Sequence, residues 1–518
     1  MISKYTTYAQ ENGGRVIVLF LLFLLALYEF VTAGFPLFAL ICCLPLVVLI
    51  VILTFRYQML IFWALICINY ILQWKARPFP LPGLPMSLYN EAFQLLLIAL
   101  ALIDVEKKRF NRCSNIMLLA LLIWCAFCTL EVLNDTCGVG IDVASWYTLS
   151  RMMAFQLLYI FIVFTLYIDT PKILIRYLYV WGGLALLAVF WVWKQKYIGL
   201  TPGESGWLHG PHGKQHLLQA GTLIRYWSVY SDAANFGIGI ASTAVAFIIF
   251  GITSKIKSHK FFFLIVGFGA AWAVFPSGTR TAIACLMAGF MAYIFLSKSF
   301  KIAIPFTIVF VLFVFMLVFT NIGNGNGQIR RMRSAFNRND ASAGARAANQ
   351  EVMKKYLKDA PWGIGIGLGY GNVPANNKYK KLSTIPPDSE YVFVWQHTGI
   401  IGITIFIITT LIMLGGACWI VFFKIKSPSL RGIGAGLCCA FVSQQLGGYG
   451  NQVLMQFPNC LIIYGGLSLV YALPYMEKEW IAYESDLIAK QEEKKRLRLE
   501  KIEKMRVKPW YNRIYKYL

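Results

Sequence analysis

Arginines occur in this chain between long apolar runs, where a fixed positive charge can bind an anion. Arg225 precedes one apolar run in the stretch LIRYWSVYSDAANFG, and Arg280 lies between two others in SGTRTA. Arg346 lies in the long polar segment 321–398. A guanidinium stays charged at physiological pH and donates paired hydrogen bonds to phosphate or carboxylate oxygens. The pattern predicts that these three arginines bind an anionic ligand.

Short polar side chains accompany two of these arginines. Ser277 and Thr279 flank Arg280, and Asp232 and Asn235 follow Arg225 directly before an apolar run. We expect these four residues to complete a polar substrate pocket. The alternative for Arg280 is that it only extends its charged end to the membrane interface.

The position of Arg346 within its own segment is informative. A helix is predicted from Ser342 to about Lys358, with Pro361 ending it. An arginine near a helix N-terminus opposes the helix dipole, whereas the lysines near the C-terminus suit it. A bound anion would explain the arginine.

A general base is expected in the stretch PPDSEYVFVWQHTGIIG. Asp388 follows two prolines and is predicted to cap a helix that runs into the membrane. Asp388 and Tyr391 share one face of that helix, and Glu390 and His397 share another. Asp388, Glu390 and His397 are the candidate bases, and Tyr391 is expected in the substrate pocket.

The amino-acid composition indicates the class of protein in which these residues lie. The chain has 518 residues, of which 58% are hydrophobic and 14% charged, with a net charge of +24. A soluble domain has about 45–50% apolar and about 25% charged residues. The sequence therefore predicts an all-α polytopic membrane protein embedded in the lipid bilayer, and we expect no nucleic-acid partner. The twelve cysteines mostly lie in or beside apolar runs and predict no disulfide framework.

Apolar runs long enough to span a bilayer predict about 12 to 14 transmembrane helices. They lie near residues 16–34, 36–55, 58–74, 88–104, 115–133, 152–169, 177–194, 233–252, 260–276, 281–297, 302–320, 399–422, 432–450 and 457–475. The predicted organisation is a set of eleven spans over 1–320, a large outer loop over 321–398, C-terminal spans over 399–475 and a tail over 476–518.

Basic residues in alternate short loops predict the orientation. These loops lie near residues 107–112, 172–176, 255–260, 298–301 and 424–431, and the positive-inside rule places them in the cytoplasm. Segment 321–398 then faces outward, because long loops cross the membrane largely regardless of charge. The tail is predicted to be a basic, amphipathic cytoplasmic helix that contacts anionic headgroups.

Two further motifs only loosely resemble ligand sites. The glycines of WGIGIGLGYG, residues 362–371, lack the spacing of a nucleotide-binding loop and predict a tight turn near the membrane. The histidines of WLHGPHGKQH have no carboxylate or cysteine at zinc-ligand spacing. No metal and no cofactor are expected.

The order of these motifs resembles the O-antigen ligase/polymerase superfamily. The resemblance rests on Arg225 with the Asp232 to Asn235 stretch, on SGTR, on Arg346 with D-x-P-W-G-I-G-I-G, and on T-G-I-I-G. It covers roughly residues 220–405. It implies a metal-independent glycosyltransferase of the bacterial inner membrane, with its active site on the periplasmic side. The implied donor is a glycan linked to undecaprenyl diphosphate.

The sequence departs from the family pattern in the last motif. Many members carry His-Asn where this chain has Asp388-Ser389, and a frequent Glu is here His397. The chemistry still fits, because a departing diphosphate needs charge stabilisation and the attacking hydroxyl needs one base. The carboxylate pair of glycoside hydrolysis is not required.

Alternatives remain open at this point. A transporter or flippase for a polysaccharide lipid would require mid-membrane charges, for which Glu29, Glu91 and Glu131 are the candidates, and two similar halves, of which the sequence shows no sign. A structural assembly protein would not require the polar outer pockets. Among enzymes, the acceptor can be a glycan, a lipid A-core or a protein, so an O-antigen ligase, a polymerase and a protein O-oligosaccharyltransferase all fit.

Overall fold

The chain is described by a computed structural model, which covers residues 13–33, 49, 52–73, 86–106, 108–210, 217–219, 223–298, 300–325, 327–333, 341–368, 373–385 and 387–506. It divides into two compact units, residues 1–63 and 64–518. Apart from two paired two-residue strands, the regular secondary structure of the described residues is helical, so the predicted all-α membrane fold is confirmed.

The first half of the chain contains apolar helices with short connections. In order, its elements are α2 (Gly13–Ala33), α4 (Gln58–Gln73), α5 (Met86–Ile103), η1 (Phe110–Cys113), α6 (Ile116–Leu130), η2 (Glu131–Leu133), α7 (Val143–Ser150), η3 (Arg151–Phe155), α8 (Gln156–Tyr167), α9 (Pro171–Tyr197), α10 (Pro202–His209), β1 (Leu218–Gln219) and β2 (Leu223–Ile224). The start of α6 is fixed by Asn115, whose side chain accepts from the backbone N–H of Met117 at 2.9 Å.

The second half carries the outer loop between apolar helices. Its elements are α11 (Ala233–Thr253), α12 (Lys257–Val274), α13 (Arg280–Leu296), α14 (Phe300–Phe319), α15 (Gly327–Arg333), α16 (Ala341–Leu357), α17 (Lys380–Thr384), α18 (Glu390–Trp419), η6 (Ile420–Lys424), α19 (Pro428–Gly450) and α20 (Asn459–Arg506). The short helices α15, α16 and α17 all lie in the predicted outer loop.

Each predicted span that falls on described residues coincides with a helix, whereas the predicted span 36–55 lies largely outside the described residues. Six helices of the described chain are long and apolar enough to cross a membrane, and further apolar helices are shorter. The protein is therefore a multi-pass membrane protein.

Helix α11 forms the centre of the unit 64–518. It packs against α12, α13 and α19, and nearly all of its side chains are buried. Its first turn is joined to the start of α20, because the Asn459 amide donates to the Asn235 side-chain oxygen at 2.7 Å. In turn, the Asn235 amide donates to the Phe457 carbonyl at 3.0 Å. These bonds fix the N-terminal end of α11.

The glycine-rich stretch after α16 packs against a break in α18. Gly399 has φ 63° and ψ −165°, so α18 is interrupted there. The backbone N–H of Ile401 donates to the Pro361 carbonyl at 3.2 Å, and that of Gly365 donates to the His397 carbonyl at 3.0 Å. A Cβ on Gly363 would come within 2.5 Å of the Gly399 nitrogen. The predicted tight turn is thus a backbone-to-backbone contact with a membrane helix.

We expect Gly399→Ala to destabilise the protein strongly. Its backbone conformation is essentially restricted to glycine and costs other residues about 1–3 kcal/mol. A Cβ there would also overlap the Pro361 carbonyl. The thermal midpoint of the detergent-purified variant should fall by several degrees, or no folded protein should be recovered. Gly415→Ala is the matched control in the same helix, because a Cβ at Gly415 meets nothing within 4 Å. Equal melting of both variants would contradict this account.

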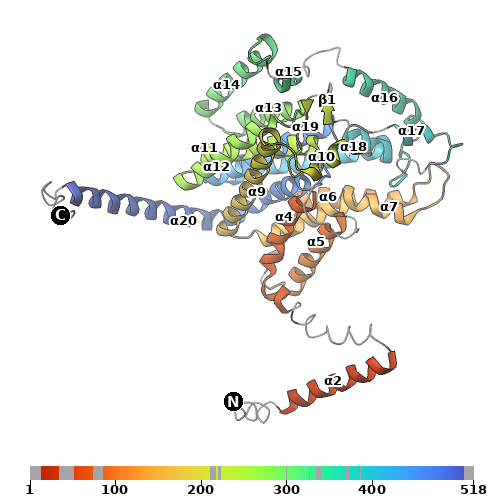
Figure 1. The fold of residues 1–518 in the computed structure, drawn as a ribbon, viewed down its shortest axis with the longest axis horizontal. Coiled ribbons are helices and arrows are strands. Elements are labelled where there is room, and N and C mark those ends of the chain that lie inside the picture. Colours follow the sequence, from red (N-terminus) through yellow and green to blue (C-terminus); the bar gives the residue numbers. More distant parts are fainter. Residues whose placement is uncertain are drawn as a thin grey trace. The chain divides into compact units, whose positions relative to one another are not determined.

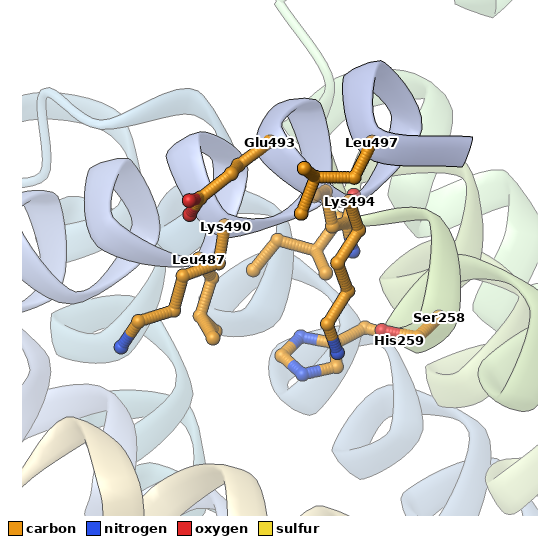
Figure 2. Close-up of a pocket in the computed structure, with 9 residues that line it drawn as sticks. Ser258, His259, Leu487, Lys490, Glu493, Lys494 and Leu497 are labelled. Carbon is orange, nitrogen blue, oxygen red and sulfur yellow. The ribbon is translucent and has the colours of Figure 1, made fainter. Parts of the chain in front are cut away.

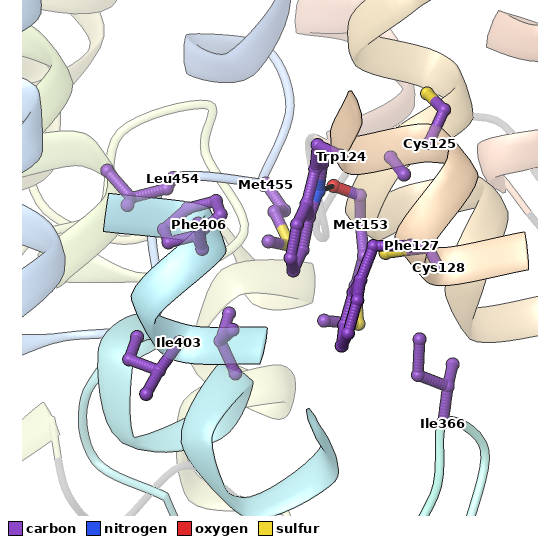
Figure 3. Packing of buried hydrophobic residues seen from close by; sticks show 12 residues of the cluster. Trp124, Cys125, Phe127, Cys128, Met153, Ile366, Ile403, Phe406, Leu454 and Met455 are labelled. Carbon is purple, nitrogen blue, oxygen red and sulfur yellow. Dashed lines mark hydrogen bonds between the residues drawn. The ribbon is translucent and has the colours of Figure 1, made fainter. Parts of the chain in front are cut away.

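An apolar core supports this interrupted part of α18. It joins residues of α6, η3, α18, the glycine-rich stretch and the segment after α19, as Figure 3 shows for Trp124, Met153, Ile366, Phe406 and Leu454. Within it, the Trp124 indole N–H donates to the Met153 carbonyl at 2.9 Å. The core fixes the positions of these segments relative to one another.

Helix α20 continues without a break from the last apolar span into the charged tail. It has 48 residues, from Asn459 to Arg506 (Figure 1). The helical tail expected over 476–518 is therefore a direct extension of a membrane helix as far as Arg506.

Candidate functional site

The C-terminal end of α19 holds the N-termini of α13 and α18. The Asn451 amide donates to the Thr281 hydroxyl at 3.1 Å, on the first turn of α13. The Ser389 hydroxyl donates to the Gly448 carbonyl at 3.0 Å, directly before α18. The segments that carry Arg280 and Asp388 are therefore attached to the same end of one helix.

The prediction that Asp388 caps α18 is wrong. The N-cap is Ser389, and its hydroxyl makes no capping bond because it binds Gly448 instead. The Asp388 carboxylate lies 3.8 Å from Nε of Arg346 on α16, with the two side chains 48% and 37% exposed. Asp388 therefore has no helix-capping role, and it remains accessible to a substrate.

Hydrogen bonds orient Arg225 toward the start of α13. Its guanidinium donates to the Thr279 hydroxyl at 3.1 Å, and that hydroxyl donates to the Ala233 carbonyl at 2.9 Å. The Ser277 hydroxyl donates to the Val274 carbonyl and accepts from the Thr279 N–H. Ser277 and Thr279 therefore shape the turn and hold Arg225. The Arg225 Nε is buried and has no hydrogen-bond partner among the described residues.

The electrostatics of Arg225 show that the three predicted arginines lie close together. Burial lowers the pKa of the Arg225 guanidinium, the Asp232 carboxylate opposes that change, and Arg280 and Arg346 lower the pKa further. The pKa of an arginine side chain normally lies far above physiological pH, so Arg225 keeps its charge. Three converging cations and a buried N–H without a partner fit an anion.

The first turn of α13 adds to this positive potential. Thr279 is its N-cap, but the hydroxyl makes no capping bond because it serves Ala233 and Arg225. The positive end of the helix dipole is therefore uncompensated by a side chain, and Arg280 is the first residue of the helix. A phosphate group is stabilised in such a place.

Arg331 is a fourth arginine at the site, and the sequence analysis did not select it. Its Nε donates to the Gly278 carbonyl at 2.5 Å, and its side chain lies beside the position of a Cβ on Gly278, as does that of Arg225. The only signal in the sequence was the run RRMR in the outer loop, which does not tell its arginines apart.

A small cavity lies beside the ion pair of Arg346 and Asp388. Its lining comes from α16 and from the start of α18, namely Arg346, Asn349, Gln350, Met353, Asp388, Ser389 and Val392. The amide side chains of Asn349 and Gln350 can donate to or accept from a sugar hydroxyl. The cavity has a volume of only about 10 Å³, so these groups are polar neighbours of the carboxylate and not a formed sugar pocket.

The other two candidate bases are buried and engaged. The Glu390 carboxylate is 3% exposed and accepts from the Leu454 N–H at 2.9 Å. His397 is 2% exposed, and its Nδ1 lies 2.8 Å from the Phe393 carbonyl, beside the break in α18. Glu390 thus links α18 to the segment after α19, and His397 is bonded within α18, whereas Asp388 remains half-exposed.

The remaining predicted pocket residues have defined places. Asp232 caps α11, where its carboxylate accepts from the Ala234 N–H at 2.8 Å. Asn235 is completely buried in the contact with α20. The Tyr391 hydroxyl donates to the Gln445 side chain at 3.0 Å. Against the lowering by burial, the Asp232 carboxylate raises the pKa of Arg225. Asn235 and Tyr391 instead form hydrogen bonds between helices.

The carboxylates considered for a transporter have structural partners where the chain is described. Glu91 forms a buried ion pair with Arg151 at 3.0 Å and accepts from the Tyr147 hydroxyl. Glu131 accepts from the Asn134 amide at 2.8 Å. The Glu29 side chain lies outside the described residues. Of the three clustered histidines, only His209 is described, at the end of α10.

Together, these features define a class of protein: a helical multi-pass membrane protein with an arginine-lined site where the outer loop meets the membrane helices. Residues 261–407 match the family described as O-antigen ligase (Wzy_C). This stretch carries Arg280, Arg346 and Asp388, so the resemblance to the O-antigen ligase/polymerase superfamily is confirmed. The match supports a function of the ligase or polymerase type. No curated protein matches the chain.

Proposed function

We propose that this protein is an inner-membrane glycosyltransferase that moves a glycan from undecaprenyl diphosphate to an acceptor hydroxyl at the periplasmic face. The observation that carries the proposal is the convergence of Arg225, Arg280 and Arg346 beside a half-exposed aspartate. Cations suit a diphosphate, and the aspartate suits the proton of the acceptor.

The reaction is a single displacement at the anomeric carbon of the donor glycan. The acceptor oxygen forms a bond to that carbon while the bond from the carbon to the diphosphate oxygen breaks. The hydroxyl proton passes to Asp388, and undecaprenyl diphosphate leaves with the electron pair. The arginines stabilise the charge that develops on the leaving diphosphate, so this chemistry requires no metal ion.

Each group has a place in this mechanism. Arg280 and Arg346 bind the diphosphate directly, and Arg225 is held against them by Thr279. Asp388 lies 3.8 Å from Arg346 before the donor arrives, which places its carboxylate beside the diphosphate site. Asn349 and Gln350 contact hydroxyl groups of the glycan or of the acceptor.

A deletion strain tests the function and separates its variants. Loss of a polymerase leaves single repeat units on lipid A, whereas loss of a ligase leaves polymer on undecaprenyl diphosphate. Loss of a protein glycosyltransferase leaves both unchanged and removes glycans from proteins. We expect one of these three profiles, restored by the native gene. Unchanged glycans in all three fractions, or carrier-linked glycan trapped on the cytoplasmic side, would overturn the proposal.

A further inference from the structure

A second polar cavity lies between the first turn of α12 and the extended part of α20, far along the chain from the site above. Its volume is about 440 Å³. It is lined by Ile256, Ser258, His259, Leu487, Lys490, Gln491, Glu493, Lys494 and Leu497. Figure 2 shows the Lys494 side chain extending from α20 toward the His259 ring. None of these residues takes part in the proposed glycan transfer.

Two contacts next to the cavity position α20, one with the connection before α12 and one with α19. Lys255, in the connection before α12, forms an ion pair at 3.1 Å with Glu484, whose side chain is 7% exposed. The Trp480 indole N–H donates to the Ser429 hydroxyl at 2.9 Å, at the start of α19. The cavity therefore lies at the helix ends that carry the basic short loops, on the face predicted to be cytoplasmic.

The polar wall of the cavity suits an anion. His259 is only 8% exposed, and its ring lines the cavity. Its ring makes an edge contact with Tyr179 and a tilted contact with Phe263. Two lysines, Lys490 and Lys494, and one acid, Glu493, line the cavity, and Lys490 also pairs with Asp486 at 2.7 Å just outside the lining. The N-cap of α12 is Ile256, which offers no side-chain capping bond to the first turn.

An apolar surface continues from this cavity along α12. Ser258, Phe261, Ile265 and Phe268 follow one another at helical spacing and share one face. The three apolar side chains are 70%, 44% and 62% exposed. On a membrane helix such side chains face lipid. A ligand with its charged end in the cavity would therefore lay a hydrocarbon tail on this face.

We infer that this cavity binds the phosphate of an anionic phospholipid from the leaflet on the side of the basic loops. Lys490 and Lys494 pair with the phosphate, His259 and Ser258 donate to its oxygens, and the acyl chains lie along Phe261, Ile265 and Phe268. The combination of a cationic cavity and an adjoining exposed apolar face favours a lipid over a soluble phosphate. This assignment is independent of the glycan-transfer proposal.

Native mass spectrometry of the full chain in detergent tests the site. Phosphatidylglycerol should bind better than phosphatidylcholine with the same acyl chains. In the double variant Lys490→Gln, Lys494→Gln, the affinity for phosphatidylglycerol should fall roughly tenfold or more. The matched control is Lys495→Gln, Lys501→Gln, which removes the same charge from α20 outside the cavity lining and should change the affinity little. Ser258→Phe fills the cavity without changing charge and should also weaken binding.

Each other outcome overturns the assignment. An equal loss of phosphatidylglycerol affinity in both double variants would mean that the basic tail attracts anionic lipids without a specific site. No preference for phosphatidylglycerol would exclude an anionic headgroup, and ready displacement by inorganic phosphate would make free phosphate the ligand. Thermal unfolding of every variant identifies misfolded protein. If Ser258→Phe is misfolded, the comparison of the two lysine pairs decides the result alone.

Discussion

Replacing Arg280 and Arg346 together with alanine should abolish glycan transfer while normal amounts of protein remain in the membrane. Each guanidinium is expected to stabilise charge on the departing diphosphate, and removing one preorganised donor of this kind costs about 10²–10³ in rate. The double variant should therefore lose at least about 10⁴. Arg346→Lys should be nearly as inactive as Arg346→Ala, because an ammonium cannot reproduce the two parallel hydrogen bonds of a guanidinium.

The measurement is transfer of glycan from undecaprenyl-diphosphate-linked donor by membranes that contain equal amounts of each variant. Lys358→Ala is the matched control, since Lys358 is exposed and directly follows the helix that carries Arg346. We expect that control to transfer at a near-native rate. Retained transfer in the Arg280→Ala, Arg346→Ala variant would remove these arginines from the mechanism.

Asp388→Asn should give a folded protein with almost no transfer. Asparagine has nearly the same shape but cannot accept the proton of the attacking hydroxyl, and loss of a general base typically costs about 10²–10⁴ in rate. Stability should change little, because Asp388 does not cap α18 and its ion pair with Arg346 is half-exposed. Such a pair contributes about 0–1 kcal/mol.

Substitutions of the two buried candidate bases, Glu390 and His397, distinguish Asp388 from them as the proton acceptor. Glu390→Gln and His397→Ala should lower transfer only as far as they lower thermal stability, because both side chains are buried and hydrogen-bonded within the protein. Transfer rate and thermal midpoint should be measured on the same preparations. Near-native transfer by Asp388→Asn, together with a stable but inactive His397→Ala, would assign the base to His397.

Much of the fold could be predicted because membrane spans are local features of the sequence. An apolar run such as 233–252 has to form a helix in lipid, and the observed α11 covers Ala233–Thr253. The break at Gly399 could not be predicted, because its cause is a partner far away in the chain, the Pro361 to Gly363 backbone. The continuity of α20 was also missed, since the change from apolar to charged residues indicates a change of solvent and not a helix end.

The sequence identified most of the residues of the candidate site, but it did not predict which of them contact one another. Arg225, Arg280 and Arg346 were selected from their outward positions, and the structure brings them into electrostatic contact. Arg331 was missed because its bond to Gly278 joins residues that are distant in the sequence. The capping role of Asp388 was wrong because the chain starts the helix one residue later, at a serine held by α19. Such choices depend on tertiary hydrogen bonds that no local pattern encodes.

The two ends of the outer loop are held by forces of different kinds. From Met353 onward an apolar cluster and the backbone bonds to α18 fix the loop. Before Met353, polar contacts such as Arg331 to Gly278 and Arg346 to Asp388 connect it to the rest of the protein. A phosphate can replace those polar contacts, but no ligand can replace the apolar cluster. The C-terminal part of α16 is thus fixed by apolar packing, whereas its N-terminal part, which carries Arg346, is held by polar contacts that a bound anion would exchange for its own.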